Sequence, residues 1–361
     1  MITAEGCRDR RRRLLERLRP NGPLLFGDPL SLRYLAGCYV DPFSLGADFG
    51  GLLLIEPNGN ARLFYDHRLP ASVNAAHADD KVPVKWYDGI SPGLGPRRTI
   101  LQPILDAVGT SGRVHDALAD IDSPAVFAAL GELRRVKDDD EVATIQMCCR
   151  AAEAGHAWAR AHVCPGMTEL DVYNGIFAAC SRHAGQPVIV YGDFAVSPGP
   201  ARRGGPPTDR VVQAGETLIL DFSVVIQGYR CDFTNTLVVG TEPTPEQRRL
   251  FDLCVSAMAA GERHLRAGVH GREVYNAVRA VFKEAGLADH FPHHAGHGLG
   301  LGHPEAPFFV KQSLEPLVSG DVVTLEPGLY VEGVGGIRIE HNYLVTEAGF
   351  ERLSRHEIAL K

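Results

Sequence analysis

Residues 218–236 of the chain read LILDFSVVIQGYRCDFTNT and place two acids, Asp221 and Asp232, in apolar surroundings. Both ends of this stretch are rich in the residue types of β-strands, and Gln227-Gly228 between them is typical of a turn. If the chain folds back there, the two acids lie nearly opposite each other across an antiparallel pair. Two buried carboxylates repel each other, so this pattern favours a cation site, with a pair of solvated edge acids as the alternative.

The composition is typical of a soluble globular protein. The 361 residues are 45% hydrophobic and 22% charged, with a net charge of −7 and a pI near 6.1. This length predicts two domains, and the mild acidity gives no indication of nucleic-acid or membrane-surface binding. No apolar run approaches the roughly 20 residues that span a bilayer, so no membrane association is expected. Eight scattered cysteines without a C-x-x-C pair favour reduced thiols and a cytoplasmic location.

Residues 1–135 alternate helical and strand patterns and are expected to form an α/β domain. The basic run Arg8–Arg13 is expected to be the exposed start of a helix, because no apolar segment of a targeting signal follows it. This domain is expected to shape a site elsewhere or to join two subunits as a homodimer. The elements predicted in it are helices over Asp9–Leu18, Pro29–Leu35 and Thr99–Val108, a strand over Pro23–Phe26, and a hairpin of Gly51–Ile55 with Ala61–Tyr65.

A boundary near Leu133–Lys137 separates this domain from a second one, residues 136–361. Asp138-Asp139-Asp140 are expected to begin a long helix there, because acidic side chains suit the N-terminal end of the helix dipole.

The second domain contains an internal repeat. Gly166–Asn174 resembles Gly268–Asn276 at an offset of 102 residues. The helices that these segments begin are expected to end at Ala184-Gly185 and Ala285-Gly286, an offset of 101, with glycine in the C-cap. Similarity at a nearly fixed offset implies a duplicated structural unit.

The duplication predicts a counterpart of the first acid pair about 100 residues further on. The two five-residue segments that end in Glu326 and Glu340 have strand composition, and Asn342–Thr346 continues the second. Glu326 follows Asp221 by 105 residues, and Glu340 follows Asp232 by 108. Each half is therefore expected to supply a two-strand ribbon with two carboxylates, and the four acids are expected to converge on a pseudo-two-fold axis.

Residues 293–303, HHAGHGLGLGH, contain four histidines among four glycines and offer a fifth ligand. Four carboxylates and one neutral imidazole carry a formal charge of −4, which two divalent cations balance. Ligands that are mostly oxygen favour Mn²⁺, and Co²⁺, Fe²⁺ and Zn²⁺ are also compatible. Two bridged metal ions activate water and polarise a carbonyl, which is the chemistry of amide hydrolysis.

Five motifs resemble, in the same order, the ligand motifs of the methionine aminopeptidase, prolidase and creatinase family. They are Leu220-Asp221, Cys231–Thr234, Gly296–Gly300, Leu325–Gly328 and Arg338–Glu340. The resemblance implies a creatinase-like N-terminal α/β domain, followed by a pseudo-two-fold duplicated α+β catalytic domain of the pita-bread fold. The two-domain layout is most similar to Xaa-Pro aminopeptidase and Xaa-Pro dipeptidase.

The resemblance also implies the metal ligands. Asp221 would chelate one metal ion, and Asp232 and Glu340 would bridge the two. His297 and Glu326 would hold the other ion.

Further residues gain catalytic or substrate-binding roles from the same resemblance. Glu326 matches the acid that takes a proton from the attacking water, and His293 matches a histidine that lines the active site. Tyr330 and Arg338 match positions that shape the substrate pocket.

The chain departs from the family pattern where substrate is held. Pro304 stands where the family has a substrate histidine, and His303, one residue earlier, is expected to replace it. Arg202-Arg203 occupies a tract in which the peptidases usually have another histidine, and these arginines could bind a substrate carboxylate or lie in solvent. Asn235 and His341 replace a usual arginine and a usual aspartate.

Three functions follow as alternatives. The first is a dinuclear metallopeptidase that cleaves the bond before proline in dipeptides or short peptides. The second is a non-peptidase amidohydrolase of the same fold that acts on a small amide or amidine. The third is an inactive binding module, which the five intact ligand motifs argue against.

Overall fold

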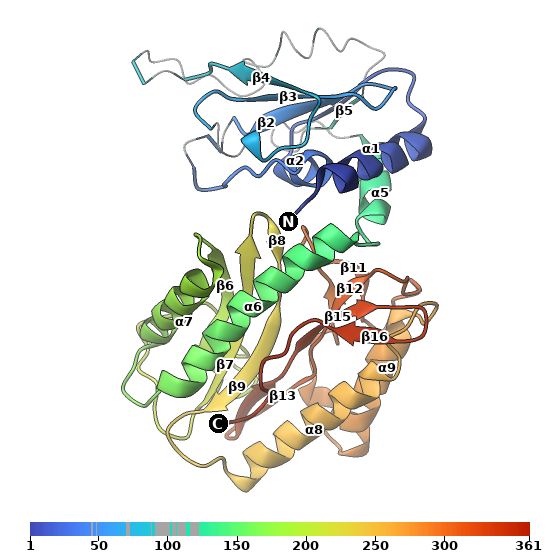
Figure 1. The fold of residues 1–361 in the computed structure, drawn as a ribbon. Coiled ribbons are helices and arrows are strands. Elements are labelled where there is room, and N and C mark those ends of the chain that lie inside the picture. Colours follow the sequence, from blue (N-terminus) through green and yellow to red (C-terminus); the bar gives the residue numbers. More distant parts are fainter. Residues whose placement is uncertain are drawn as a thin grey trace. The chain divides into compact units, whose positions relative to one another are not determined.

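The computed structural model describes residues 1–44, 46–47, 49–69, 73–87, 89–90, 102, 106, 113–115 and 123–361 (Figure 1). The chain divides into two compact units, Met1–Arg134 and Arg135–Lys361. Within these described ranges, no helix combines the length and the apolar character needed to cross a membrane.

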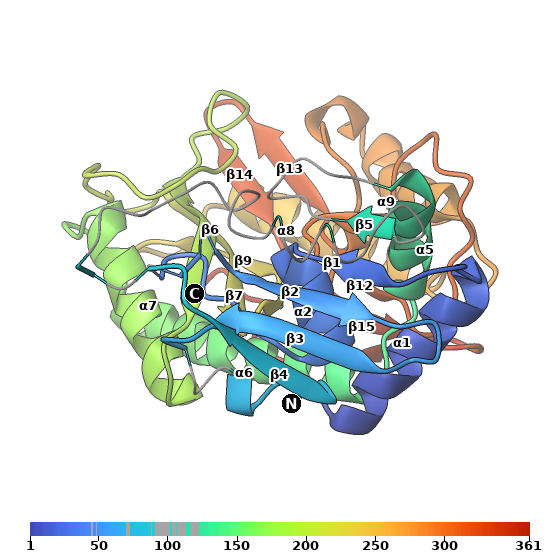
Figure 2. The same cartoon turned by 90° about the horizontal axis from the view of Figure 1, so that it is seen from above.

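The first unit is a five-stranded sheet with the order β4-β3-β2-β1-β5, and α1 and α2 cover one of its faces (Figures 1 and 2). The predicted hairpin is confirmed, because β2 and β3 pair antiparallel from Gly51↔Tyr65 to Ile55↔Ala61. The predicted helix Thr99–Val108 lies, apart from two positions, outside the described residues. The bounds are α1 Ala4–Leu18, β1 Leu24–Phe26, α2 Pro29–Ala36, β2 Gly51–Ile55, β3 Ala61–Asp66, β4 Asp80–Val84, β5 Arg113–His115 and α5 Pro124–Leu133.

The prediction that the basic run Arg8–Arg13 is exposed is wrong for two of its residues. Arg10 and Arg11 are buried, with exposed fractions of 0% and 2%. Arg10 Nε donates to the carbonyl oxygen of Tyr34 at 2.8 Å, and Arg11 Nη1 donates to that of Leu35 at 2.8 Å. The carbonyls of the last turn of a helix generally need partners from outside it, and here the two guanidinium groups donate to two of them.

The second unit has two similar halves, each with a helix pair and strands. The first half contains α6 Asp139–His162, α7 Glu169–Ala184, β6 Ile189–Val196, β7 Thr217–Ile226, β8 Tyr229–Arg230 and β9 Phe233–Val238. The second half contains α8 Pro245–Glu262, α9 Gly271–Glu284, η2 Ala288–His290, β10 His297–Gly298, β11 Glu305–Phe308, β12 Val322–Leu325, β13 Gly328–Val331, β14 Gly335–Arg338, β15 His341–Val345 and β16 Phe350–Arg352. Figure 1 shows α6 beside α7 in one half and α8 beside α9 in the other.

The predicted repeat corresponds to α7 and α9. The Thr168 hydroxyl caps α7 by accepting a hydrogen bond from the backbone N–H of Asp171 at 3.0 Å. Gly185 ends this helix in the left-handed conformation, with φ of 65°. In the second half α9 begins after His270, and Gly286 follows its end with φ of 73°. Glycine adopts this backbone conformation without steric cost, which explains its place at both helix ends.

The strands of the first half differ in register from the prediction. Asp221 in β7 pairs with Thr234 in β9, so Asp232 is its diagonal neighbour on the same face of the sheet. Ser223 takes the position nearest to Asp232, and its hydroxyl donates to Asp232 Oδ1 at 3.2 Å. The two acids are therefore close together without being directly opposite each other.

The predicted ribbon of the second half is confirmed for its continuation, Asn342–Thr346, and wrong for the segment that ends in Glu340. The strand before Glu326, β12, pairs antiparallel with β15, whereas β14 pairs with β13 in a separate two-stranded sheet. Glu340 lies between β14 and β15, where its backbone N–H donates to the carbonyl oxygen of Thr234 at 3.0 Å. Arg338 exchanges two hydrogen bonds with the Thr236 hydroxyl, at 2.8 and 3.0 Å, and these bonds join β14 to the first half.

A stack of buried aromatic and imidazole rings lies beneath β7 and β9. His156 stacks on Phe222 with ring centroids 4.5 Å apart, and His356 stacks on Phe233 at 4.4 Å. The two imidazole centroids are 4.8 Å apart. Burial lowers the pKa of His356 to about 4 and that of His156 well below its usual value.

This stack predicts that acid destabilises the protein as the pH falls from 6.5 towards 4. The unfolded chain protonates these imidazoles near pH 6.5 while the folded chain keeps them neutral, so the free energy of unfolding falls as the pH drops from 6.5 towards 4. Replacing His356 with Phe should flatten this dependence by up to about 1.4 kcal/mol per pH unit. Urea unfolding at several pH values measures the slope. The exposed control His183→Phe should keep the wild-type slope, and a His356→Phe slope equal to the control's would contradict the prediction.

Candidate metal centre

A cavity of about 430 Å³ in the second unit brings together the acids and histidines of both halves. Glu340, with an exposed fraction of 1%, lies buried beside this cavity rather than on its wall. The residues that line the cavity are Tyr191, Gly192, Asp193, Arg203, Asp221, Ser223, Asp232, His293, His294, His297, His303, Pro304, Glu326, Tyr330 and Arg338.

Three carboxylates from three strand segments form one potential ligand group. Asp221 comes from the middle of β7, Asp232 precedes β9, and Glu340 follows β14. One carboxylate oxygen of each lies within 4.8 Å of the others. Thr234 supports the group, because its hydroxyl donates to Glu340 Oε2 at 2.7 Å.

A second potential ligand group lies on the histidine-rich loop and the end of β12. It consists of His294, His297 and Glu326, whose ligand atoms also lie within 4.8 Å of one another. His297 Nδ1 donates to the carbonyl oxygen of Gly298 at 3.0 Å, which leaves Nε2 facing the carboxylates. That nitrogen is 3.7 Å from Glu326 Oε1 and 3.8 Å from Asp232 Oδ2.

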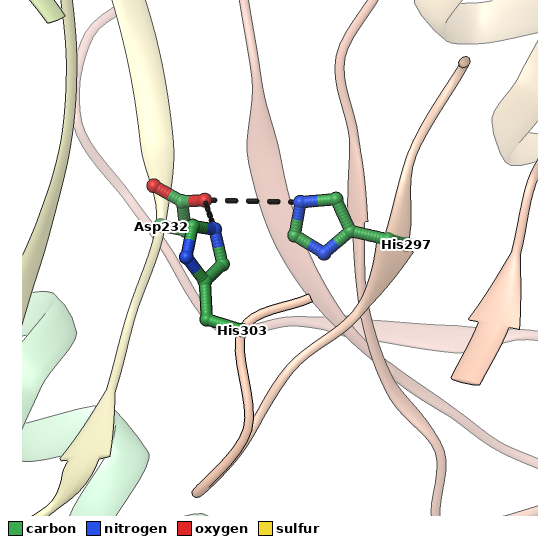
Figure 3. Close-up of side chains that lie close together, drawn as sticks. All are labelled: Asp232, His297 and His303. Atoms are coloured by element: carbon green, nitrogen blue, oxygen red, sulfur yellow. Dashed lines mark hydrogen bonds and ion pairs between the residues drawn. The ribbon is translucent and has the colours of Figure 1, made fainter. Parts of the chain in front are cut away.

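A third group links the other two and includes the histidine expected to replace the substrate histidine. Figure 3 shows the rings of His297 and His303 directed at the same carboxylate oxygen of Asp232. His303 Nε2 donates to Asp232 Oδ2 at 2.7 Å. Burial lowers the pKa of His303, but the hydrogen bond to Asp232 outweighs burial and leaves it raised. The structure therefore brings together His303 and all five expected ligand residues.

The chemistry of this cluster fits divalent cations. Burial, together with the nearby carboxylates, raises the pKa of Asp221 to about 7 even though the Arg338 guanidinium opposes the shift. Burial and the same neighbouring acids raise the pKa of Glu340 well above its usual value. Carboxylates that destabilise one another in this way become ionised ligands when a cation lies between them.

Arg338 forms ion pairs with two acids of adjacent strands. Its Nη2 lies 2.6 Å from Asp221 Oδ2 and also contacts Asp193. Asp193 pairs with Asp221 in the register of β6 and β7, which places both side chains on one face. Asp193 was not predicted as a site residue. A strand alignment of residues 189–196 against β7 is the signal that would have found it.

Tyr330 connects Arg338 to His293 in a buried hydrogen-bond chain. Arg338 Nη1 donates to the Tyr330 hydroxyl oxygen at 2.8 Å. His293 Nδ1 donates to the carbonyl oxygen of His294 at 2.7 Å, so Nε2 accepts from the Tyr330 hydroxyl at 3.2 Å. Burial raises the pKa of Tyr330 to about 12 and lowers that of His293 to about 4. Both groups are therefore neutral near pH 7.

Arg202 and Arg203, which occupy the tract where the family usually has a histidine, have different environments. Arg202 forms two hydrogen bonds with the buried carboxylate of Glu169, at 2.8 and 2.9 Å, and so supports the fold. Arg203 is exposed and belongs to the residues that line the cavity, and its backbone carbonyl oxygen accepts a hydrogen bond from Arg338 Nη1 at 3.4 Å.

The sequence profile of metallopeptidase family M24 matches residues 143–347, and the chain belongs to this family. It is a metallopeptidase with the pita-bread fold, as the resemblance of the five motifs implied. The family uses divalent metal ions, which agrees with the cluster of ligand residues in the cavity.

Relatives resemble the chain along nearly its whole length. An uncharacterized peptidase of Staphylococcus aureus (strain USA300) is 29% identical over 344 residues, which cover 91% of this chain and 93% of the relative. The solved Xaa-Pro dipeptidase from Bacillus anthracis has a TM-score of 0.78 at 24% identity and covers 99% of both chains. The dipeptidase PepE from Mycobacterium ulcerans has a TM-score of 0.72 at 26% identity, covering 99% of this chain and 98% of its own.

Proposed function

We propose that this metallopeptidase hydrolyses the peptide bond before proline in dipeptides or short peptides, using two divalent metal ions. The observation that carries the proposal is the convergence of four of the five expected ligand residues, three further histidines and two arginines on one cavity, with the fifth expected ligand, Glu340, buried beside it. The fold that the chain shares with the Xaa-Pro dipeptidase from Bacillus anthracis and the X-Pro aminopeptidase from Thermotoga maritima supports the choice of proline.

In this proposal Asp221, Asp232, His297, Glu326 and Glu340 would hold the two ions, and Asp232 and Glu340 would serve both, as the family resemblance implies. Bound metal ions supply polarisation of the peptide carbonyl and activation of water. Four carboxylates in this set favour Mn²⁺, and Co²⁺, Fe²⁺ and Zn²⁺ remain compatible.

In the same proposal, Glu326 receives the proton of the attacking water. Burial would raise the pKa of its carboxyl, but the hydrogen bond from His294 and the surrounding imidazoles outweigh burial and lower it. Glu326 is therefore ionised at neutral pH, with Oε1 accepting from His294 Nε2 at 2.9 Å. An ionised carboxylate on the cavity wall can accept a proton from the attacking water.

Arg203 is proposed to bind the C-terminal carboxylate of a dipeptide substrate. Arg203 is an exposed residue of the cavity lining, and the paired N–H groups of a guanidinium bind a carboxylate through charge-assisted hydrogen bonds. Replacing Arg203 with Ala should raise KM for Xaa-Pro dipeptides about 10-fold or more while kcat changes little. The reason is that Arg203 would bind the substrate carboxylate equally in the ground state and in the transition state. Steady-state kinetics on each dipeptide and on its C-terminal amide measure the effect.

The amide is the matched substrate control, because it lacks the negative charge. Arg203→Ala should leave its KM unchanged, and so should the exposed control variant Arg248→Ala for both substrates. An equal rise in KM for the acid and the amide would show that Arg203 does not recognise the carboxylate.

A turnover screen tests the proposed function. The protein is assayed with Mn²⁺, Co²⁺ and Zn²⁺ against Xaa-Pro dipeptides, Xaa-Pro-Yaa tripeptides and matched peptides without proline. Small amides such as creatine and acylated amino acids complete the panel. Release from the Xaa-Pro peptides alone supports the proposal. Turnover of a non-peptide amide together with inactivity on the peptides would replace it with the amidohydrolase alternative.

A further inference from the structure

His294 is a cavity residue to which neither the five ligand motifs nor the proposed mechanism gives a metal-binding role. Its side chain is 36% exposed towards the cavity, and its Nε2 lies 2.9 Å from Glu326 Oε1. His297 Nε2 lies 3.7 Å from the same oxygen. Two imidazole nitrogens and one carboxylate oxygen therefore face a common point, and the three ligand atoms lie within 4.8 Å of one another.

The backbone around His294 is fixed against β12, so this arrangement is built into the fold. Ala295 accepts a hydrogen bond from the backbone N–H of Glu326 at 2.9 Å and donates one to Phe309 at 2.9 Å. Gly296 has φ of 154°, and a Cβ there would lie 2.2 Å from the carbonyl oxygen of Thr324. Only glycine permits this close approach, and the approach holds His294 opposite Glu326.

The two groups of potential ligands differ in their donor atoms. Asp221, Asp232 and Glu340 offer only carboxylate oxygens. His294, His297 and Glu326 offer two nitrogens and one oxygen. Nitrogen donors favour Zn²⁺ and Co²⁺, whereas carboxylate oxygens suit Mn²⁺ and Mg²⁺.

We propose that His294 is a sixth metal ligand, and that it makes the two metal positions chemically unlike. The position of His294, His297 and Glu326 then prefers Zn²⁺ or Co²⁺, and the position of the three carboxylates prefers Mn²⁺. This inference rests on the dinuclear site of the proposed function and adds the identity of the ion at each position. In the alternative role, His294 only donates a hydrogen bond to Glu326 and does not select a metal.

Metal competition distinguishes the two roles. The full chain is stripped with a chelator, given equal amounts of Zn²⁺ and Mn²⁺, dialysed, and analysed for both elements. Wild-type protein should retain about one zinc and one manganese ion per chain. His294→Gln should bind zinc about 10-fold or more weakly and should retain manganese. Loss of a residue that only hydrogen-bonds to a metal ligand already weakens metal binding on this scale. The exposed control His183→Gln should behave as wild type.

X-ray absorption of protein with a single zinc equivalent counts the imidazoles directly. Wild type should show two imidazoles on zinc and His294→Gln one, with circular dichroism spectra that match. A wild-type count of one, unchanged in the variant, would overturn the role of His294 and leave the dinuclear site intact. Failure of the stripped wild type to retain either metal would overturn the proposed function as well, so the two failures are distinguishable.

Discussion

Replacing Asp232 with Asn together with Glu340 with Gln is expected to abolish turnover and to remove at least one metal ion per chain. Asp232 belongs to two of the three groups of potential ligands, and Glu340 is the most deeply buried acid of the cluster. Neutral amides at both positions remove the two charges proposed to lie between the ions. Because metal chemistry contributes several kcal/mol to the transition state, turnover should fall by a factor of about 10³ or more.

Elemental analysis after loading with Mn²⁺ measures the first effect, and peptide hydrolysis measures the second. Wild-type protein should contain close to two metal ions per chain. The control is Asp209→Asn with Glu284→Gln, which makes the same chemical changes at two exposed acids and should alter neither quantity. Metal content in the Asp232 and Glu340 variant equal to that of the control would disprove the dinuclear assignment.

Local signals in the sequence predict many elements of this fold correctly. The stretch 218–236 forms β7, β8 and the start of β9, and Gln227 and Gly228 turn the chain with φ of 49° and 91°. The helix ends at Gly185 and Gly286 were predicted from the same kind of signal. These features depend on the conformational preferences of a few adjacent residues, which the sequence states directly.

Strand partners were harder to predict than the strands themselves. The segment ending in Glu340 has strand composition, but it pairs with β13, and its Arg338 is bonded to Thr236 about 100 residues earlier in the chain. Likewise, Arg10 and Arg11 are buried where their guanidinium groups donate to carbonyl oxygens at the end of α2. Such long-range contacts depend on the assembled fold, and the residue types alone do not encode them.

The candidate site was likewise predicted only where the signals were local in the sequence or came from the family resemblance. Duplicated offsets and a family resemblance indicated the acids and His297, whereas Asp193 enters the cavity only through its register with Asp221. His294 follows His293 on an irregular loop, where neighbouring side chains have no fixed periodicity. The use of Mn²⁺, a homodimer and a cytoplasmic location stay predictions.

Replacing His303 with Ala is expected to lower kcat by about 10²-fold or more while metal content stays at the wild-type level. His303 belongs to a directed chain of donors. Arg230 Nη1 donates to the Tyr191 hydroxyl oxygen at 2.7 Å, and that hydroxyl donates to His303 Nδ1 at 3.0 Å. Because Nδ1 accepts in this hydrogen-bond chain, the proton of His303 is on Nε2, which points at Asp232 Oδ2 inside the cavity.

An Nε2–H held in this orientation can donate to a developing oxyanion or to the leaving nitrogen of the substrate. Losing such a donor costs about 10²- to 10³-fold in rate. His303→Gln retains an N–H donor and should recover part of the activity, whereas Tyr191→Phe removes only the group that orients the ring and should have a smaller effect. Metal analysis and kcat are measured on the same preparations, because a loss of metal would make His303 a ligand instead. A His303→Ala variant with near-normal kcat would show that the ring only fills the loop between β10 and β11, and that Pro304 has no functional substitute.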